Sequence, residues 1–174
     1  MRFSILLLTP LLIFQAKAVN LDEISFHNEQ SDTTKITNIL VKYVDVIDSG
    51  ERILEIGKEF LGTPYVAHTL EGETEMLTVN LDELDCTTYV ETVMALSYTA
   101  GERRTSWRDY VYNLERIRYR NGKLDGYASR LHYISDWIID NSYRGNFVEV
   151  TNRLPLHSYM VKNIDFMSAH RSSY

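Results

Sequence analysis

Leu84-Asp85-Cys86-Thr87-Thr88-Tyr89-Val90-Glu91 is the stretch around which the rest of this chain is organised. Apolar residues continue beyond it at three- and four-residue steps as far as Leu96, which predicts a helix. Asp85 is a favourable N-cap residue and therefore places Cys86 in the first helical turn. Backbone N–H groups at a helix start favour the thiolate form of a cysteine and so make it nucleophilic. Cys86 is the only cysteine in the chain, and we predict that it is a reactive group and not a buried small hydrophobe.

The composition is that of one globular domain. The chain has 174 residues, of which 44% are hydrophobic, and its mean hydropathy is -0.24. This length is sufficient for a substantial core. The formal charge is -6, and it becomes -8 if Arg2 and Lys17 are removed with an N-terminal leader. Such an acidic protein is not expected to bind nucleic acid or an anionic membrane surface as its main partner.

Residues 1–18 are typical of a cleavable signal peptide. Arg2 precedes an apolar run over residues 3–14, and Ala16-Lys17-Ala18 forms a small-x-small cleavage site. The apolar run is short for a membrane span, so a retained anchor is the alternative and not the first interpretation. We therefore predict an exported protein with no stable membrane insertion after cleavage. A single cysteine excludes an internal disulfide, which leaves an intermolecular bridge or a reactive thiol.

Helices dominate the pattern after a polar leader over residues 19–34, which we expect to be loose. Residues 35–174 form one predicted domain, with few strand signals. Helices are predicted over residues 36–48, 51–61, 85–100 and 106–120, and over the second half of 127–141. Short strands are predicted within 76–81 and 147–150. The buried faces expected for the first two helices comprise Ile36, Ile39, Leu40, Tyr43, Val44 and Ile47, then Ile53, Leu54, Ile56 and Phe60.

Four motifs occur in an order that resembles a known family. They are Gly62-Thr63-Pro64-Tyr65, the Cys86 stretch quoted above, Ile117-Arg118-Tyr119-Arg120-Asn121-Gly122 and Tyr127-Ala128-Ser129-Arg130-Leu131-His132-Tyr133. The first two resemble the active-site entry of the NlpC-type cell-wall hydrolases, which are papain-like cysteine peptidases and amidases. The whole set is most similar to the N-acetylmuramoyl-L-alanine amidase-like branch, which is found in bacteria. The resemblance covers residues 53–174.

The resemblance implies an α+β fold, namely the helix-rich portion of an NlpC-type, papain-like domain. In that family an antiparallel sheet follows the cysteine helix. Strand signals are weak after Cys86, so we expect this downstream sheet to be short or missing and the domain to be incomplete at its C-terminus. Export would place the protein in the periplasm or outside a bacterial cell.

The resemblance also implies a set of site residues. Cys86 is the expected nucleophile, Tyr65 a group that helps to hold the oxyanion, and Asp85 a substrate contact. A thiol nucleophile needs a histidine base that a third group orients. His132 is our candidate for the base, with Asp136 four residues on as its orienting group. Further expected substrate contacts are His68, which follows the first motif, and Arg130, a possible clamp for a stem-peptide carboxylate. The other histidines are His27, His157 and His170.

These expectations together describe an exported cysteine amidase. Its predicted reaction is hydrolysis of the N-acetylmuramoyl-L-alanine bond in peptidoglycan fragments (muropeptides). The alternatives are a stem-peptide endopeptidase and a truncated, non-catalytic remnant that binds cell-wall fragments. We expect no cofactor and no metal, because the sequence has no His-x-x-x-His pair or Cys/His ligand cluster. The oligomeric state stays open.

Overall fold

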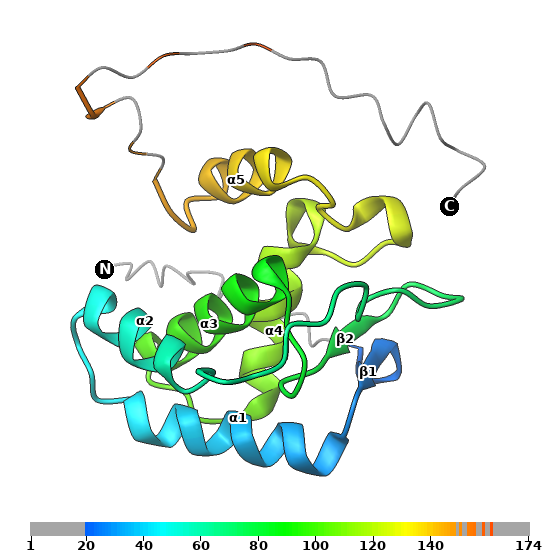
Figure 1. The fold of residues 1–174 in the computed structure, drawn as a ribbon, viewed down its shortest axis with the longest axis vertical. Coiled ribbons are helices and arrows are strands. Elements are labelled where there is room, and N and C mark those ends of the chain that lie inside the picture. The colour runs from blue at the N-terminus through cyan, green and yellow to red at the C-terminus, as the bar shows by residue number, and fades with distance from the viewer. Residues whose placement is uncertain (1–19, 149, 151–152, 156–157, 159–160, 162–174) are drawn as a thin grey trace, which may run out of the picture.

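A computed structural model describes residues 20–148, 150, 153–155, 158 and 161 of the chain (Figure 1). The predicted signal peptide, His157 and His170 lie outside these residues. Five α-helices and two short strands are present in this part of the chain, together with three 3₁₀ turns. Their bounds are η1 (Leu21–Glu23), β1 (Ile24–Phe26), α1 (Glu29–Tyr43), α2 (Ser49–Lys58), β2 (Leu77–Val79), α3 (Cys86–Gly101), α4 (Trp107–Arg118), η2 (Arg120–Gly122), η3 (Tyr127–Ser129) and α5 (Ile134–Tyr143).

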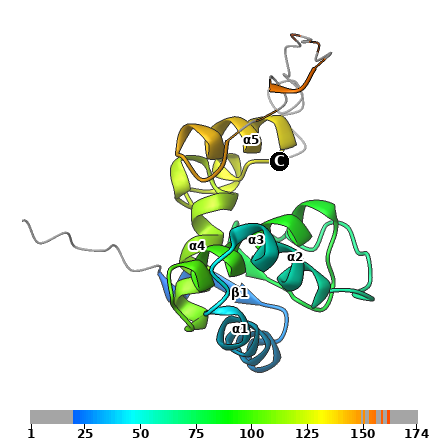
Figure 2. The same cartoon turned by 90° about the vertical axis from the view of Figure 1, so that its left-hand side faces the viewer.

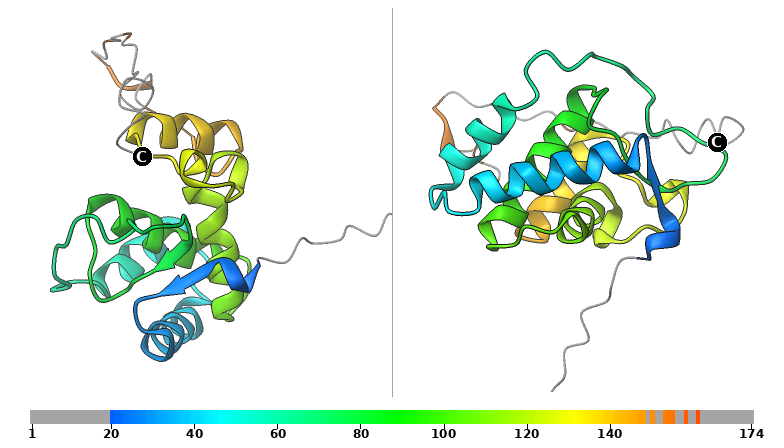
Figure 3. Two further views of the ribbon diagram at one scale, coloured as in Figure 1. Left: turned by 90° about the vertical axis from the view of Figure 1, so that its right-hand side faces the viewer. Right: turned by 90° about the horizontal axis from the view of Figure 1, so that it is seen from below.

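Helices α3 and α4 form the centre of the molecule. Helix α3 contacts α1, α2 and α4, while α1 and α5 pack near opposite ends of α4 (Figure 2). Seen from below, α1 runs across the base of the molecule in front of α3 and α4 (Figure 3). The core that these helices enclose includes Ile36, Leu40, Ile56, Leu81, Ala95, Leu96, Val111, Leu114 and Ile117. No helix in the described residues is long and apolar enough to cross a membrane.

The only sheet in this part of the chain is small and parallel. Strands β1 and β2 pair in the register Ile24–Leu77, Ser25–Thr78 and Phe26–Val79. The strand expected within 76–81 is thus confirmed, and the mixed, helix-rich composition agrees with an α+β class. The one antiparallel pairing among the described residues is an isolated bridge between Tyr119 and Arg130. An antiparallel sheet after the cysteine helix is therefore not seen in the described part of the chain.

The prediction of a loose leader over residues 19–34 is wrong for residues 20–34. This segment contains η1, β1 and the start of α1. Asn28 caps α1 by accepting a hydrogen bond from the Ser31 N–H at 3.1 Å. The polar composition was misleading because a three-residue strand and a capped helix start need few apolar side chains. The segment gains its order from its partner β2, which lies some fifty residues further along the chain.

Two of the predicted helix faces were too wide. Helix α1 ends at Tyr43, so Val44 and Ile47 lie beyond it, and Ile47 is 85% exposed. In α2, Ile56 is buried, and Phe60 is buried just after the helix, whereas Leu54 is 59% exposed. Asp48 caps α2 by accepting from the Glu51 N–H at 2.8 Å. This cap fixes the helix start at Ser49 and so sets which side of α2 faces α3.

The strand expected over residues 147–150 is also not formed by the described residues of this range. The Phe147 ring instead stacks on the Trp137 ring of α5, with 5.2 Å between the ring centroids. Val148 and Val150 are exposed. The alternating pattern therefore reflects one aromatic contact with α5 and not a paired strand.

A buried ion pair joins α3, α4 and β2. The Arg118 Nε donates to a Glu91 carboxylate oxygen at 2.7 Å, and both side chains are almost fully buried. The Arg118 Nη1 also donates to the Thr78 carbonyl at 2.6 Å. Because Thr78 lies in β2, the ion pair links the strand to the two central helices.

Tyr110 of α4 should make the protein sensitive to alkaline pH. The side chain is buried, and burial raises the pKa of Tyr110 to about 12. In the unfolded chain a tyrosine ionises near pH 10, so the unfolded state is stabilised before the folded state as the pH rises. We expect the free energy of unfolding to fall by about 2 kcal/mol between pH 10 and pH 12 from this residue alone.

Urea unfolding of the wild type and of Tyr110→Phe at several pH values measures this loss. Tyr110→Phe should start from a lower free energy of unfolding at pH 8, because it lacks the hydrogen bond to Thr92. It should then lose less of that free energy on going to high pH. Tyr112→Phe, which alters an exposed tyrosine of the same helix, is the control and should follow the wild type. Equal losses in the wild type and Tyr110→Phe would contradict the assignment.

Candidate active site

Cys86 is placed by the N-terminal cap of α3. The Asp85 Oδ1 accepts hydrogen bonds from the Thr87 N–H at 2.9 Å and the Thr88 N–H at 2.8 Å. The Thr88 hydroxyl accepts in return from the Asp85 N–H at 2.8 Å, which completes a capping box. The predicted helix start is therefore confirmed, and Cys86 is the first residue of the helix and is exposed.

The cap leaves one donor beside the sulfur. Helix starts have backbone N–H groups with no partner inside the helix. Here Asp85 satisfies those of Thr87 and Thr88, and Tyr89 bonds to the Asp85 carbonyl at 2.9 Å. Within the described part of the chain, the N–H of Cys86 has no acceptor. It is thus available to an oxygen atom of a bound molecule.

A backbone bridge brings Tyr65 to the same place. The Leu84 N–H donates to the Pro64 carbonyl at 3.1 Å, and the Val66 N–H donates to the Leu84 carbonyl at 3.2 Å. Gly62 turns the chain into this bridge with a φ of 87°, a left-handed conformation that glycine adopts without steric cost. The first two motifs of the sequence are therefore held side by side by hydrogen bonds between their own backbones.

A cavity of about 230 Å³ lies where these two motifs meet. It brings together three of the predicted site residues, Cys86, Tyr65 and Asp85, and Tyr65 is 72% exposed. The complete lining is Phe60, Thr63, Tyr65, Leu84, Asp85, Cys86 and Tyr89.

The sequence interpretation missed two aromatic residues of this cavity. The rings of Phe60 and Tyr89 meet edge to face with 6.3 Å between their centroids. The Tyr89 hydroxyl donates to the Gly57 carbonyl at 3.2 Å, which fixes the ring against α2. Tyr89 lies three positions after Cys86, so helical spacing alone places both side chains on one face. Phe60 was predicted as a core residue, and it is both buried and part of the cavity wall.

The structure places His132 outside the cavity lining. Its Nε2 lies 2.9 Å from the Tyr127 carbonyl, and its ring lies against the Tyr127 ring with 4.4 Å between centroids. The prediction that Asp136 orients His132 is wrong, because Asp136 forms an ion pair with Arg120. The reason is that α5 begins at Ile134, so His132 and Asp136 do not share a helix.

Arg130 and His68 are likewise not among the residues that line the Cys86 cavity. Arg130 is buried, and its guanidinium forms ion pairs with Glu71 at 2.9 Å and Glu75 at 3.4 Å. The group expected to clamp a substrate carboxylate is thus engaged by carboxylates of the protein itself. His68 is exposed on the loop that follows Tyr65 and has a φ of 64°. The catalytic or binding roles of His132, Arg130 and His68 stay predictions.

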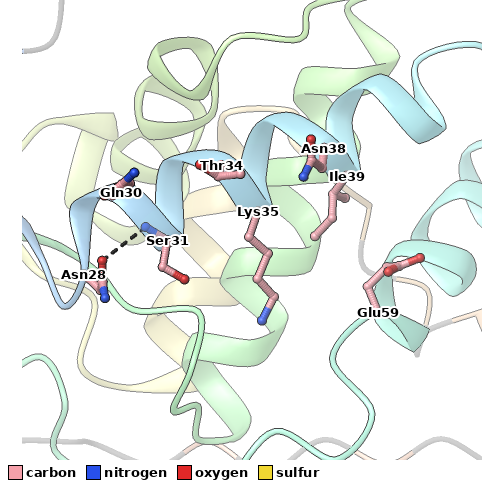
Figure 4. A pocket seen from close by; sticks show the side chains of 8 residues that line it. All are labelled: Asn28, Gln30, Ser31, Thr34, Lys35, Asn38, Ile39 and Glu59. Carbon is pink, nitrogen blue, oxygen red and sulfur yellow. Dashed lines mark hydrogen bonds between the residues drawn. The ribbon is translucent and has the colours of Figure 1, made fainter.

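A second, larger hollow of about 550 Å³ lies on the polar side of α1 (Figure 4). Its residues are Asn28, Gln30, Ser31, Thr34, Lys35, Asn38, Ile39 and Glu59. Glu59 accepts hydrogen bonds from Lys42 and Tyr43, and the bond from Lys42 is the main cause that lowers the pKa of Glu59.

Among the described residues, no group of three or more His, Cys, Asp or Glu side chains is arranged to hold a metal ion.

Comparisons with known proteins show the family of this chain. Residues 55–174 match the family described as AmiA-like, N-acetylmuramoyl-L-alanine amidase-like. No curated protein matches the chain. A solved structure from Bacteroides uniformis ATCC 8492, named as an N-acetylmuramoyl-L-alanine amidase, is 44% identical with a TM-score of 0.64, over 72% of this chain and 52% of that chain.

Two further solved structures are similar. A Bacteroides fragilis protein provisionally named as a xylanase is 43% identical with a TM-score of 0.62, over 70% of this chain and 52% of its own. Protein LPG0564 from Legionella pneumophila is 27% identical with a TM-score of 0.57, over 67% of this chain and 39% of its own. The chain thus spans about half or less of the length of the solved structures that it matches.

Proposed function

Because the chain belongs to the AmiA-like family of N-acetylmuramoyl-L-alanine amidase-like proteins, we propose that it is an exported cysteine amidase of peptidoglycan fragments. The bond cleaved is the amide between the lactyl group of muramic acid and L-alanine. The observation that carries this proposal is the exposed Cys86 at a capped helix start, in one cavity with Tyr65.

The chemistry of such a cleavage fits the groups at this cavity. A Cys86 thiolate attacks the amide carbonyl carbon, and the carbonyl oxygen takes the negative charge of the tetrahedral intermediate. The unpaired N–H of Cys86 is one donor for that oxygen, and the Tyr65 hydroxyl is the second in our proposal. The C–N bond then breaks, the amine of L-alanine leaves with a proton, and water hydrolyses the thioester.

The proton transfers require a general base and acid. None of the seven residues that line the cavity is a histidine. We keep His132 as the candidate base of this proposal. Its ring contacts Tyr127 and does not line the cavity, so the proposal requires His132 to approach Cys86 in the substrate complex.

The proposal has two further parts. The first is that the domain is papain-like and of the NlpC type, and the second is that the protein is exported and cleaved after Ala18. Supporting the first are the cysteine at a helix start and the Gly62-Thr63-Pro64-Tyr65 turn beside it. Supporting the second is the composition of residues 1–18. Among the described residues no histidine lines the cavity, and this observation is the one that favours a rival function, a non-catalytic protein that binds cell-wall fragments.

Product analysis tests this proposal. The purified protein, lacking residues 1–18, is incubated with a muropeptide. The products are separated by liquid chromatography, and their masses are measured by mass spectrometry. We expect a free stem peptide that begins with L-alanine and a muramic acid with a free lactyl carboxylate. Protein whose Cys86 has been alkylated with iodoacetamide should be inactive.

Each rival function gives a different product pattern. An endopeptidase leaves L-alanine on the sugar and releases a shorter peptide. A binding protein leaves the muropeptide intact although it retains the fragment in a binding assay. Hydrolysis that is equally fast after complete alkylation of Cys86 would contradict a cysteine mechanism.

A further inference from the structure

A five-residue connection, residues 80–84, leads from β2 to the cap of the Cys86 helix. Leu81 lies in this connection, and α1 holds both of its backbone polar groups. The Leu81 N–H donates to Asp32 Oδ1 at 3.1 Å, and the Leu81 carbonyl accepts from Lys35 Nζ at 2.9 Å. Asp32 and Lys35 are three positions apart and so lie on one face of α1. Figure 4 shows the Lys35 side chain extending away from α1.

Asp32 is buried, which makes its bonds to the backbone costly to lose. Only 1% of the residue is exposed, and its second oxygen, Oδ2, accepts from the Asn28 N–H at 3.0 Å. Burial raises the pKa of Asp32. A buried carboxylate is tolerated only when its hydrogen bonds are satisfied, so the Leu81 N–H is a required partner.

The same face of α1 also contacts a residue of the Cys86 cavity wall. The Lys35 ammonium lies 5.1 Å from the centroid of the Phe60 ring, and Phe60 is part of the cavity wall. Leu81 is followed three residues later by Leu84, which forms the bridge to Pro64 and Val66 and also lines the cavity. Helix α1 therefore contacts one residue of the cavity wall, Phe60, and holds Leu81, which lies three residues before a second one, Leu84.

We propose that Asp32 and Lys35 are positioning residues for the Cys86 site: by holding Leu81, they fix the connection that places Leu84 and the Asp85 cap. This inference rests on the proposed function above. Helix α1 lies outside residues 55–174, the range that matches the family. The support that it gives to the cavity is therefore additional to the features that define the family match.

Two kinds of measurement on a small set of variants test this role. Asp32→Asn replaces one carboxylate oxygen with an NH₂ group and so disrupts the paired acceptor. Lys35→Met keeps the stem but removes the donor, while Lys35→Arg keeps a donor. Lys42→Met is the matched control, because Lys42 lies on the same helix and its ammonium pairs with Glu59 at the surface. Hydrogen exchange follows the amides of Leu81, Leu84 and Val66, and kinetics gives kcat and KM for the muropeptide.

We expect Asp32→Asn and Lys35→Met to accelerate exchange at Leu84 and Val66 as well as at Leu81, with amides in the middle of α4 unchanged. The value of kcat should fall by about tenfold or more while KM changes little, since small displacements of reacting groups reduce the rate of the chemical step strongly. Lys35→Arg should restore both quantities, and Lys42→Met should leave both at wild-type values.

Two results would overturn the proposal. One is faster exchange at Leu81 alone, with Leu84 and Val66 unaffected. The other is a lower free energy of unfolding with unchanged kcat, which would show that α1 only stabilises the fold. The exchange measurement needs no enzymatic activity, so it decides the question even if the wild type fails to hydrolyse muropeptides. If Asp32→Asn does not fold, the comparison of Lys35→Met with Lys35→Arg decides it.

Discussion

An Arg118→Met variant should lose about 3–5 kcal/mol of the free energy of unfolding, because the Glu91 carboxylate then stays buried without its cation. The Thr78 carbonyl loses its bond from Arg118 as well. Natural domains are stable by only about 5–15 kcal/mol, so this loss is a large part of the total free energy of unfolding. Urea unfolding followed by circular dichroism at 20 °C measures the loss.

Arg104→Met is the control for the charge change. Arg104 forms an exposed ion pair with Asp109 at 2.6 Å, and exposed pairs contribute about 1 kcal/mol or less. The double variant Arg118→Met with Glu91→Leu should recover part of the loss, because no uncompensated charge is then buried. A loss of less than about 1 kcal/mol in Arg118→Met would mean that the pair is not buried in solution.

Cys86→Ala should abolish muropeptide cleavage, with a fall in kcat of about 10⁴-fold or more, because no thioester can form. The substitution is conservative at an exposed helix start, so circular dichroism and the free energy of unfolding should match the wild type closely. Product formation measured by mass spectrometry at saturating muropeptide gives the rate.

Tyr65→Phe provides the graded comparison. It removes a proposed oxyanion donor and leaves the nucleophile, so we expect a loss on the order of a hundredfold and not a complete loss. The phenyl ring preserves the apolar contacts of the exposed side chain. Cleavage by Cys86→Ala at a rate comparable with the wild type would refute the nucleophile assignment, and equal rates for Tyr65→Phe and wild type would refute the role of the hydroxyl.

Local signals in the sequence were sufficient for most of the helices and for the position of the cysteine. The start of α3 follows from Asp85, because a cap depends on side chains within three residues of it. The start of α4 follows likewise from Ser106, which accepts from the Arg108 N–H at 3.2 Å. The proximity of Tyr65 and Cys86 was expected only from the resemblance, since it depends on a bridge between Tyr65 and Leu84, which lie nineteen positions apart.

Contacts between distant segments were beyond the reach of pattern alone. Nothing local indicates that β1 pairs with β2, or that Asp32 bonds to Leu81. The His132 prediction was affected by the same limit. Its spacing to Asp136 fits a helix, but the chain is extended at Tyr133 and the helix begins one residue later. The carboxylate partners of Arg130 lie on a loop some sixty residues earlier. The local sequence therefore did not indicate that Arg130 is paired within the protein, and it was interpreted as a substrate-binding group.

The backbone bridge between Tyr65 and Leu84 fixes the two ends of the loop that joins them, and the tip of this loop is free to vary in sequence and length. Both ends of the loop between them are held by this bridge, so the spacing between Tyr65 and Leu84 does not depend on which residues form the loop tip. Doubling the length of a flexible loop costs only about 0.6 kcal/mol in closure entropy. Its exposed tip at Gly72 and Glu73 is therefore a place where we expect insertions to be tolerated without disturbing the bridge.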